Sequence, residues 1–79
     1  KNGDKYKGEF LNGKKHGQGI YTWLSGSKYV GDWENEKKHG EGTHFYSNGD
    51  RYVGQWRNDE KYGRGTYIYA NGRTKTQYN

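Results

Sequence analysis

The sequence contains three histidines that could bind a metal ion, but their spacing argues against that role. His16 and His39 are 23 residues apart, and a further step of 23 leads to Tyr62, which is a poor metal ligand. If this spacing places the two histidines two strands apart in one sheet, about 10 Å separates them. One metal ion needs each ligand nitrogen at about 2 Å. We therefore expect no metal site, and we expect these histidines to pack at hairpin bends.

Glycine pairs and serines offer two other kinds of chemistry, and the sequence lacks the partners for each. Gly-x-Gly begins at Gly17, Gly40 and Gly63, but the third glycine of a dinucleotide-binding pattern is missing and no helix follows. The serines lie beside turn residues with no strained elbow or distinct base nearby, which disfavours acyl transfer. The sequence thus predicts no catalytic residue, no cofactor and no small-molecule substrate, and indicates a protein that is not an enzyme.

The composition restricts how this 79-residue chain folds. Leu, Ile, Val and Phe are few, whereas nine Tyr and three Trp are present, so the fold must bury aromatic rings. Fourteen glycines disfavour long helices, since each costs about 1 kcal/mol relative to alanine in a helix interior. No apolar run has the length of a membrane-spanning helix, no signal-peptide pattern is present and no cysteine is available for disulfides. The chain begins with Lys1, and we expect it to be part of a longer protein.

The strongest signal in the sequence is an internal repeat of 23 residues, carried by aromatic residues and glycines. Positions that recur in this way include Tyr6, Tyr29 and Tyr52; Phe10, Trp33 and Trp56; Gly19, Gly42 and Gly65; and Trp23, Tyr46 and Tyr69. Within each unit the residue types alternate with a period of two, which is typical of strands, and Gly-, Asn- and Ser-rich segments between them are typical of turns. The pattern predicts an all-β antiparallel meander with six strands near residues 5–10, 18–24, 28–34, 41–47, 51–57 and 64–70.

The alternation also predicts how the strands pair. Tyr46 lies opposite Tyr52 in this register, and Gly42 then lies opposite Trp56. Each such glycine would be covered by a large ring, an arrangement known as aromatic rescue of strand glycines. The pairing requires a three-residue connection at residues 48–50, whereas Asn-Gly on its own favours a two-residue type I′ turn.

The repeat unit resembles the MORN repeat (membrane occupation and recognition nexus). The resemblance rests on Tyr29-Val-Gly-Asp-Trp33, Lys37-Lys-His-Gly-Glu-Gly-Thr43 and Tyr46-Ser-Asn-Gly49, which recur with few changes in the units before and after. It implies an elongated, single-layer β-meander built from tandem β-hairpins. We expect one array over residues 1–79, with units near 6–28, 29–51 and 52–74 and a degenerate or truncated end at 75–79.

The resemblance also implies a class of function, because MORN repeats serve in scaffolding and protein–protein contact. We expect a non-enzymatic repeat module for protein–protein interaction and assembly. Two alternatives stay open: a peripheral membrane-binding module that contacts acidic phospholipids, and an accessory region of an enzyme whose catalytic domain lies outside this segment. The resemblance alone favours an intracellular location, either cytoplasmic or associated with membrane or cytoskeleton.

The aromatic face of the predicted sheet is the first candidate for a partner-binding surface. A single-layer sheet cannot bury both faces, so rings that do not cover one another stay exposed, like the Tyr- and Trp-rich centres of interfaces. The candidate groove consists of Tyr21, Trp23, Tyr29, Trp33, Tyr46, Tyr52, Trp56, Tyr67 and Tyr69. We expect the central rings Trp33, Tyr46, Tyr52 and Trp56 to contribute most of the affinity for a helix or extended peptide. The opposite face has an apolar row that offers a second partner surface or a homodimer contact: Ile20, Val30, Phe45, Val53 and Ile68.

Lysines at the hairpin bends form the second candidate surface. The formal net charge is +5, and alternating hairpins bring the bends at residues 11–17, 34–40 and 57–63 to one edge. The candidate acidic-lipid edge consists of Lys14, Lys15, Lys37, Lys38 and Lys61. Each well-placed lysine contributes about 1 kcal/mol to binding an acidic lipid surface. Nucleic acid is not an expected partner, because rings that cover glycines are not free to stack on bases.

Overall fold

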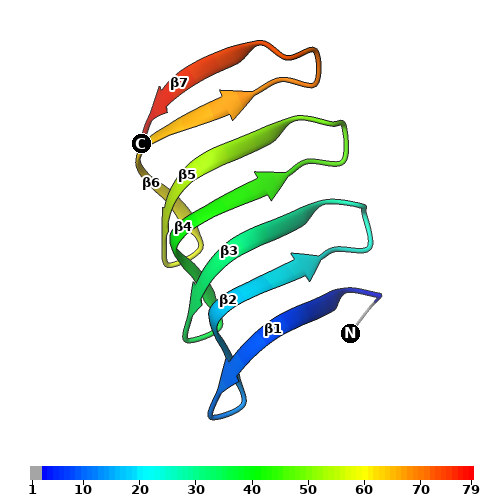
Figure 1. Cartoon of the computed structure of the whole chain (residues 1–79), viewed down its shortest axis with the longest axis vertical. Helices are drawn as coiled ribbons and strands as arrows, with labels where there is room; N and C mark the ends of the chain where they lie inside the picture. Colours follow the sequence, from blue (N-terminus) through cyan, green and yellow to red (C-terminus); the bar gives the residue numbers. More distant parts are fainter. Residues whose placement is uncertain (1–2) are drawn as a thin grey trace.

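The computed structural model describes residues 3–79, which form one open antiparallel sheet whose strands follow one another in chain order (Figure 1). The strands are β1 (Lys5–Leu11), β2 (Lys14–Thr22), β3 (Lys28–Glu34), β4 (Lys37–Phe45), β5 (Arg51–Arg57), β6 (Glu60–Ile68) and β7 (Thr74–Tyr78). The described residues contain no helix, and therefore none that could cross a membrane. The molecule measures 39 × 26 × 15 Å. The predicted all-β class and the single-layer meander are confirmed.

The number of strands and several of their starts differ from the prediction. Residues 74–78 form a seventh strand, β7, which pairs with β6 as β3 pairs with β2: Tyr67 lies opposite Lys75, and Tyr21 lies opposite Tyr29. Hence the tail is a first strand of the repeat that lacks the usual aromatic residues. The strands β2, β4 and β6 each begin four residues earlier than predicted, because their lysine-containing starts continue the backbone ladder.

Two kinds of connection alternate along the sheet. The longer loops after β2, β4 and β6 lie at one end of the strands, and the tight turns after β1, β3 and β5 lie at the other end (Figure 1). Each tight turn has two residues, both with positive φ, for example Asn35 at 54° and Glu36 at 74°. This is the backbone of a type I′ turn, whose twist matches that of the flanking strands. Each of these hairpins also contains a β-bulge. In the hairpin of β3 and β4, the register shifts between Gly31 and Trp33.

The predicted register is wrong by two residues at the longer loops. Tyr52 lies opposite His44 and not opposite Tyr46, and Trp56 lies opposite Gly40 and not opposite Gly42. The reason is the loop itself, which consists of residues 47–49: the Tyr46 N–H donates to the Asp50 carbonyl at 2.8 Å. Because the shift is an even number, every ring stays on the predicted face.

The core of the sheet lies on its aromatic face and consists of rings. Its buried members are Tyr29 and Tyr52, each 0 % exposed, and Trp33 and Trp56, each 5 % exposed. The rings meet edge to face, with 5.2 Å between the ring centroids of Tyr29 and Trp33 and 5.4 Å between those of Tyr29 and Trp56. Such pairs contribute about 1 kcal/mol beyond the burial of their area. Aromatic rings thus replace the aliphatic core that the composition lacks.

Candidate partner-binding surface

Tyrosines that cover glycines fix the floor of the aromatic face. The ring of Tyr29 crosses from β3 to β4 and lies against Gly42, where a Cβ atom would overlap the tyrosine hydroxyl. Its hydroxyl donates to the Asp32 carbonyl at 3.1 Å. Burial raises the pKa of the Tyr29 hydroxyl, so this group stays protonated and remains a donor. Tyr52 covers Gly65 in the same manner.

Aromatic cover of strand glycines is therefore confirmed, but the covering ring differs from the predicted one. Trp56 was expected to cover Gly42, and instead its indole N–H donates to the Gly42 carbonyl at 3.2 Å. Trp33 donates to the Gly19 carbonyl at 3.3 Å. The two-residue change of register explains why a tyrosine covers the glycine in place of a tryptophan. It moves Trp56 away from the position opposite Gly42, and the ring of Tyr29 lies diagonally over Gly42 from the other neighbouring strand.

The first glycine of each Gly-x-Gly pair has another role. Gly40 has a φ of 82°, and a Cβ atom there would approach the Asp32 side chain. That carboxylate accepts the Glu41 N–H at 3.1 Å, which joins β3 to β4 where the ladder is broken by the bulge. The Gly-x-Gly motif is thus structural: one glycine bends the strand, and the next accepts a tyrosine ring.

Six rings of the aromatic face lie outside the core and form a continuous row beside the longer loops. We call this set the outer aromatic row: Tyr21, Trp23, His44, Tyr46, Tyr67 and Tyr69. Successive ring centroids lie 4.8, 5.3, 4.6, 5.7 and 4.9 Å apart. Five of the six are half-buried, and Tyr69 is 39 % exposed.

The predicted groove therefore divides into two sets. Its members Tyr29, Trp33, Tyr52 and Trp56 are buried against one another, whereas Tyr21, Trp23, Tyr46, Tyr67 and Tyr69 are in the outer aromatic row. Of the four rings expected to contribute most of the affinity, Tyr46 alone is half-exposed. The same alternation predicts that His44 lies on the aromatic face and stacks there, which the contacts with Trp23 and Tyr46 confirm. The predicted groove did not include His44, although its position in the repeat is equivalent to those of Tyr21 and Tyr67.

Three lysines lie over the same face, and we call Lys15, Lys38 and Lys61 the lysine row. The Lys38 ammonium lies 4.7 Å from the Trp56 ring centroid, and the Lys61 ammonium lies 4.6 Å from the Tyr52 centroid. Cations at such distances are attracted by the ring faces. Burial, and to a smaller degree the charge of Lys61, lowers the pKa of Lys38.

The predicted basic edge is thus split between two surroundings. Lys15, Lys38 and Lys61 are half-buried over rings, whereas Lys14 and Lys37 are exposed. Between the outer aromatic row and the lysine row lies a hollow of ≈ 310 Å³, lined by Lys15, Tyr21, Trp23, Trp33, Glu36, Lys38 and Asp59. This hollow offers aromatic walls on one side and charged groups of both signs on the other.

Metal-ligating side chains do not gather in the described part of the chain. Residues 3–79 contain no group of three or more His, Asp or Glu side chains that could hold a metal ion. Of the two histidines at the bends, His39 lies 3.2 Å from the Glu34 carboxylate through its Nε2 atom. The chemistry that this face offers is ring stacking, cation–π attraction and hydrogen bonding.

Comparison with known proteins identifies the repeat. The family model of the MORN repeat matches the chain three times in tandem, at residues 6–28, 29–51 and 52–72. The chain belongs to the MORN repeat family. The three matches begin at Tyr6, Tyr29 and Tyr52, whose rings cover the strand glycines. No curated protein matched the chain in a sequence search.

The three MORN units differ at one hydrogen bond of the aromatic face. In the first unit the Tyr21 hydroxyl donates to the Asp4 carboxylate at 3.0 Å, and in the third the Tyr67 hydroxyl donates to Asp50 at 2.7 Å. That bond lowers the pKa of Asp50 and raises the pKa of Tyr67 to about 12. In the second unit, Ser27 and His44 occupy the two positions.

His44 is therefore a local departure from the repeat, at the centre of the outer aromatic row. Burial, followed by the charges of Lys38 and Lys61, lowers the pKa of His44 to about 4. Its Nδ1 atom is buried and has no hydrogen-bond partner. The ring is consequently neutral near pH 7 and lies between Trp23 and Tyr46 as one more aromatic group.

A second difference among the MORN units lies at the tight turns. Glu36 and Asp59 occupy the position of Gly13, and each reaches back to the preceding hairpin. The Asp59 N–H donates to the Lys38 carbonyl at 3.1 Å, and the Asp59 carboxylate accepts the Lys38 N–H at 2.8 Å. Glu36 makes the equivalent pair with Lys15 and adds a salt bridge of 2.5 Å. These turn residues clamp neighbouring hairpins together.

Proposed function

We propose that this MORN array is a non-catalytic interaction module whose protein partner docks on the outer aromatic row. Membership of the family supports a repeat module of the kind that commonly serves in interaction or association with membranes. The observation that carries the proposal is the division of the aromatic face: four rings stabilise the sheet, and six continuous rings are left half-buried or exposed.

The chemistry of this row favours a peptide or helix that inserts apolar side chains between rings. Tyr and Trp offer large, rigid contact areas, and their ordering costs little conformational entropy. The hollow beside Tyr21 and Trp23 provides a site for one inserted side chain. The lysine row beside it would attract acidic groups of the partner and would make the association rate depend on salt.

The proposal is tested by selecting peptides from a random display library on the immobilised chain and measuring their affinity by fluorescence anisotropy. Trp23→Ala and Tyr46→Ala should each weaken a selected peptide about 30-fold, equivalent to about 2 kcal/mol. Tyr78→Ala is the matched control, because Tyr78 is 75 % exposed and lies on the opposite face. Peptides that bind all three variants as tightly as the unmodified chain would show that the row is not the docking site.

Binding to acidic lipid is the alternative that the same variants distinguish. Sedimentation with vesicles that contain acidic phospholipid should leave the chain in the supernatant if the aromatic row serves proteins. If the chain sediments, and Lys14→Glu with Lys37→Glu releases it while Trp23→Ala does not, the lipid edge replaces the proposed function.

A further inference from the structure

The face opposite the aromatic rings carries charged side chains that lie in rows across β1 to β5. Because the strands pair in fixed register, residues that are opposite one another in adjacent strands form rows that cross the sheet. The apolar row is Ile20, Val30, Thr43, Val53 and Thr66, each opposite the next. Ile20 is 39 % exposed and Val53 is 41 % exposed, so this row is open to solvent.

Rows of opposite charge flank the apolar row on its two sides. On the side of the longer loops, two residues along each strand, lies the basic row: Lys5, Lys28 and Arg51, with Thr22, Phe45 and Ile68 between them. On the side of the tight turns lies the acidic row, which contains Asp32 and Glu41 with Gln18 and Gln55, and which ends on β6 at the basic Arg64. Lys28 and Asp32, on one strand, are about 13 Å apart along the backbone.

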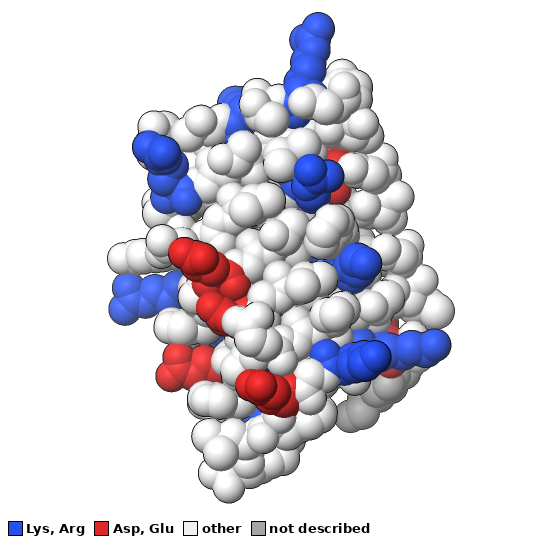
Figure 2. Space-filling view, in the orientation of Figure 1, with Lys and Arg blue, Asp and Glu red and all other residues white. Residues whose placement is uncertain are grey.

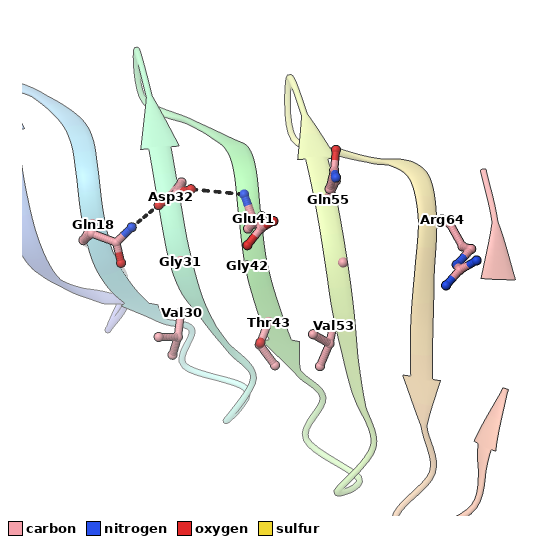
Figure 3. Close-up of a pocket in the computed structure, with 11 residues that line it drawn as sticks. Gln18, Val30, Gly31, Asp32, Glu41, Gly42, Thr43, Val53, Gln55 and Arg64 are labelled. Carbon is pink, nitrogen blue, oxygen red and sulfur yellow. Dashed lines mark hydrogen bonds between the residues drawn. The ribbon is translucent and has the colours of Figure 1, made fainter. Parts of the chain in front are cut away.

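The figures show how the charges are arranged. In Figure 2, blue side chains follow the right-hand side, toward the longer loops, and red side chains lie at the centre left and lower left, with further blue side chains at the left edge. Figure 3 shows the middle of the face, where Asp32 is joined to Gln18 and to the backbone of Glu41, with Val30, Thr43 and Val53 beside them. Within residues 3–79, the charges of Lys28, Arg51 and Glu41 form no salt bridge.

We propose that this face binds the same face of a second copy of the chain, about a twofold axis parallel to the apolar row. Such a rotation lays apolar row on apolar row and reverses the strand direction, so each basic row lies over the partner's acidic row. Lys28 then lies over the partner's Asp32, and Arg51 lies beside the partner's Glu41. A twofold axis along the strands would instead place basic row on basic row, which the charges oppose.

Size and shape agree with this pairing. The two longer extents of the molecule, 39 and 26 Å, limit the area of this face to about 1,000 Å², and an interface of standard size buries about 800 Å² of each partner. A hollow of ≈ 500 Å³ between the apolar and acidic rows has Asp32 and Glu41 in its lining and Arg64 at its β6 end. The carboxylates of Asp32 and Glu41 offer a place for the long side chains of the partner's basic row. Two faces of β-sheets stack in this way at about 10 Å.

Charge exchange between two variants tests the proposal by sedimentation equilibrium. Variant A carries Arg51→Glu, which puts two carboxylates beside each other where Arg51 meets Glu41 of the second copy. Variant B carries Glu41→Lys and Gln55→Lys, which puts lysines beside Arg51 of the second copy. The unmodified chain should be dimeric, and the dissociation constant of A alone or B alone should rise at least tenfold. An equal mixture of A and B should form a dimer at least as tight as that of the unmodified chain.

The control variant carries Lys75→Glu, which changes the net charge as much as variant A but on the aromatic side, where Lys75 lies opposite Tyr67. It should dimerise like the unmodified chain, and circular dichroism should show all variants folded. A monomeric unmodified chain at millimolar concentration, dimers that persist in A and B, or a mixture that stays monomeric would each overturn the proposal. Open-ended oligomers that are insensitive to A and B would show that strand edges associate instead of this face.

Discussion

At the scale of single residues, His44 shows how one substitution alters a repeated hydrogen-bond pattern. Tyr21 and Tyr67 each donate to an aspartate, whereas His44 has a buried Nδ1 atom without a partner. This position among the rings accommodates a neutral imidazole. It disfavours an imidazolium, because burial and the positive charges of Lys38 and Lys61 oppose protonation of His44. The free energy of unfolding should therefore depend on pH through His44, which lies in the second unit.

The sign of this dependence follows from proton binding. Because the pKa of His44 falls from 6.5 to about 4 on folding, the unfolded chain binds a proton in this range that the folded chain does not. Stability contributed by this residue is therefore complete above pH 6.5 and decreases as the pH falls toward 4. Thermal unfolding followed between these pH values should show a smaller decrease for His44→Tyr. His16→Tyr, which copies Tyr62 of the third unit, should keep the full decrease, and equal slopes in the two variants would contradict the assignment.

At the scale of elements, one residue of a tight turn both adopts a left-handed backbone conformation and hydrogen-bonds to the preceding hairpin. Asp59 has a φ of 71°, and its carboxylate and N–H clamp Lys38 of the preceding hairpin. Asp59→Ala loses the hydrogen bond to the carboxylate, worth about 1 kcal/mol, and puts an ordinary residue in the left-handed region, at about 1 kcal/mol more. We expect a loss of about 2 kcal/mol in the free energy of unfolding, measured with urea.

Asp59→Asn is the matched control, because asparagine tolerates the left-handed region and keeps an acceptor oxygen. It should cost less than about 0.5 kcal/mol. If Asp59→Ala also costs less than about 0.5 kcal/mol, the clamp between the hairpins contributes nothing. A loss of about 2 kcal/mol for both variants would identify the charge of Asp59, and not its hydrogen-bond geometry, as the source of stability.

These elements also show what a single sequence predicts and what it does not. The period of two assigned every ring to its correct face, and the glycine spacing predicted the meander. The register was wrong because the residues near Asn48-Gly49 allow a loop that begins at either Ser47 or Asn48, and only the bond between Tyr46 and Asp50 decides. The starts of β2, β4 and β6 were missed because lysine-rich segments resemble turns in composition, although their backbones pair. β7 was missed because its Thr74–Tyr78 segment has a strand's pairing without the repeat's aromatic residues.

The unpredicted register also limited the prediction of the candidate surface. Composition alone cannot divide rings into buried and accessible sets, since Trp33 and Trp23 have the same residue type and lie on the same face. Diagonal packing between strands makes the division, and it depends on the register. One signal was available in the sequence: Gly13, Glu36 and Asp59 break the repeat at one position, and the structure relates that break to the clamps between hairpins.

At the scale of the whole molecule, stability is distributed along a one-dimensional array. Each hairpin contacts mainly its neighbours in the sequence, as in other repeat proteins. The core rings Tyr29, Trp33, Tyr52 and Trp56 belong to β3 and β5, whereas β1 and β7 are edge strands with one neighbour each. Within β1, Phe10 is 60 % exposed and covers little of the sheet. The edges therefore have fewer buried rings to stabilise their backbone bonds than the middle has.

This gradient predicts the order in which backbone amides exchange with solvent. We expect the amides of β3, β4 and β5 to exchange slowest in hydrogen–deuterium exchange followed by NMR, because their opening exposes Tyr29 and Tyr52, each 0 % exposed in the folded chain. Paired amides of β1 and β7 should exchange at least tenfold faster, since fraying of an edge strand leaves those two rings buried among β3, β4, β5 and β6. At the end next to β7, Asn79 donates to the Tyr52 hydroxyl at 2.8 Å, so Asn79→Ala should speed exchange in β7 and leave β1 unchanged. Equal protection across all seven strands would instead mean that the sheet opens only as a whole, and that the array lacks the independence of its end units.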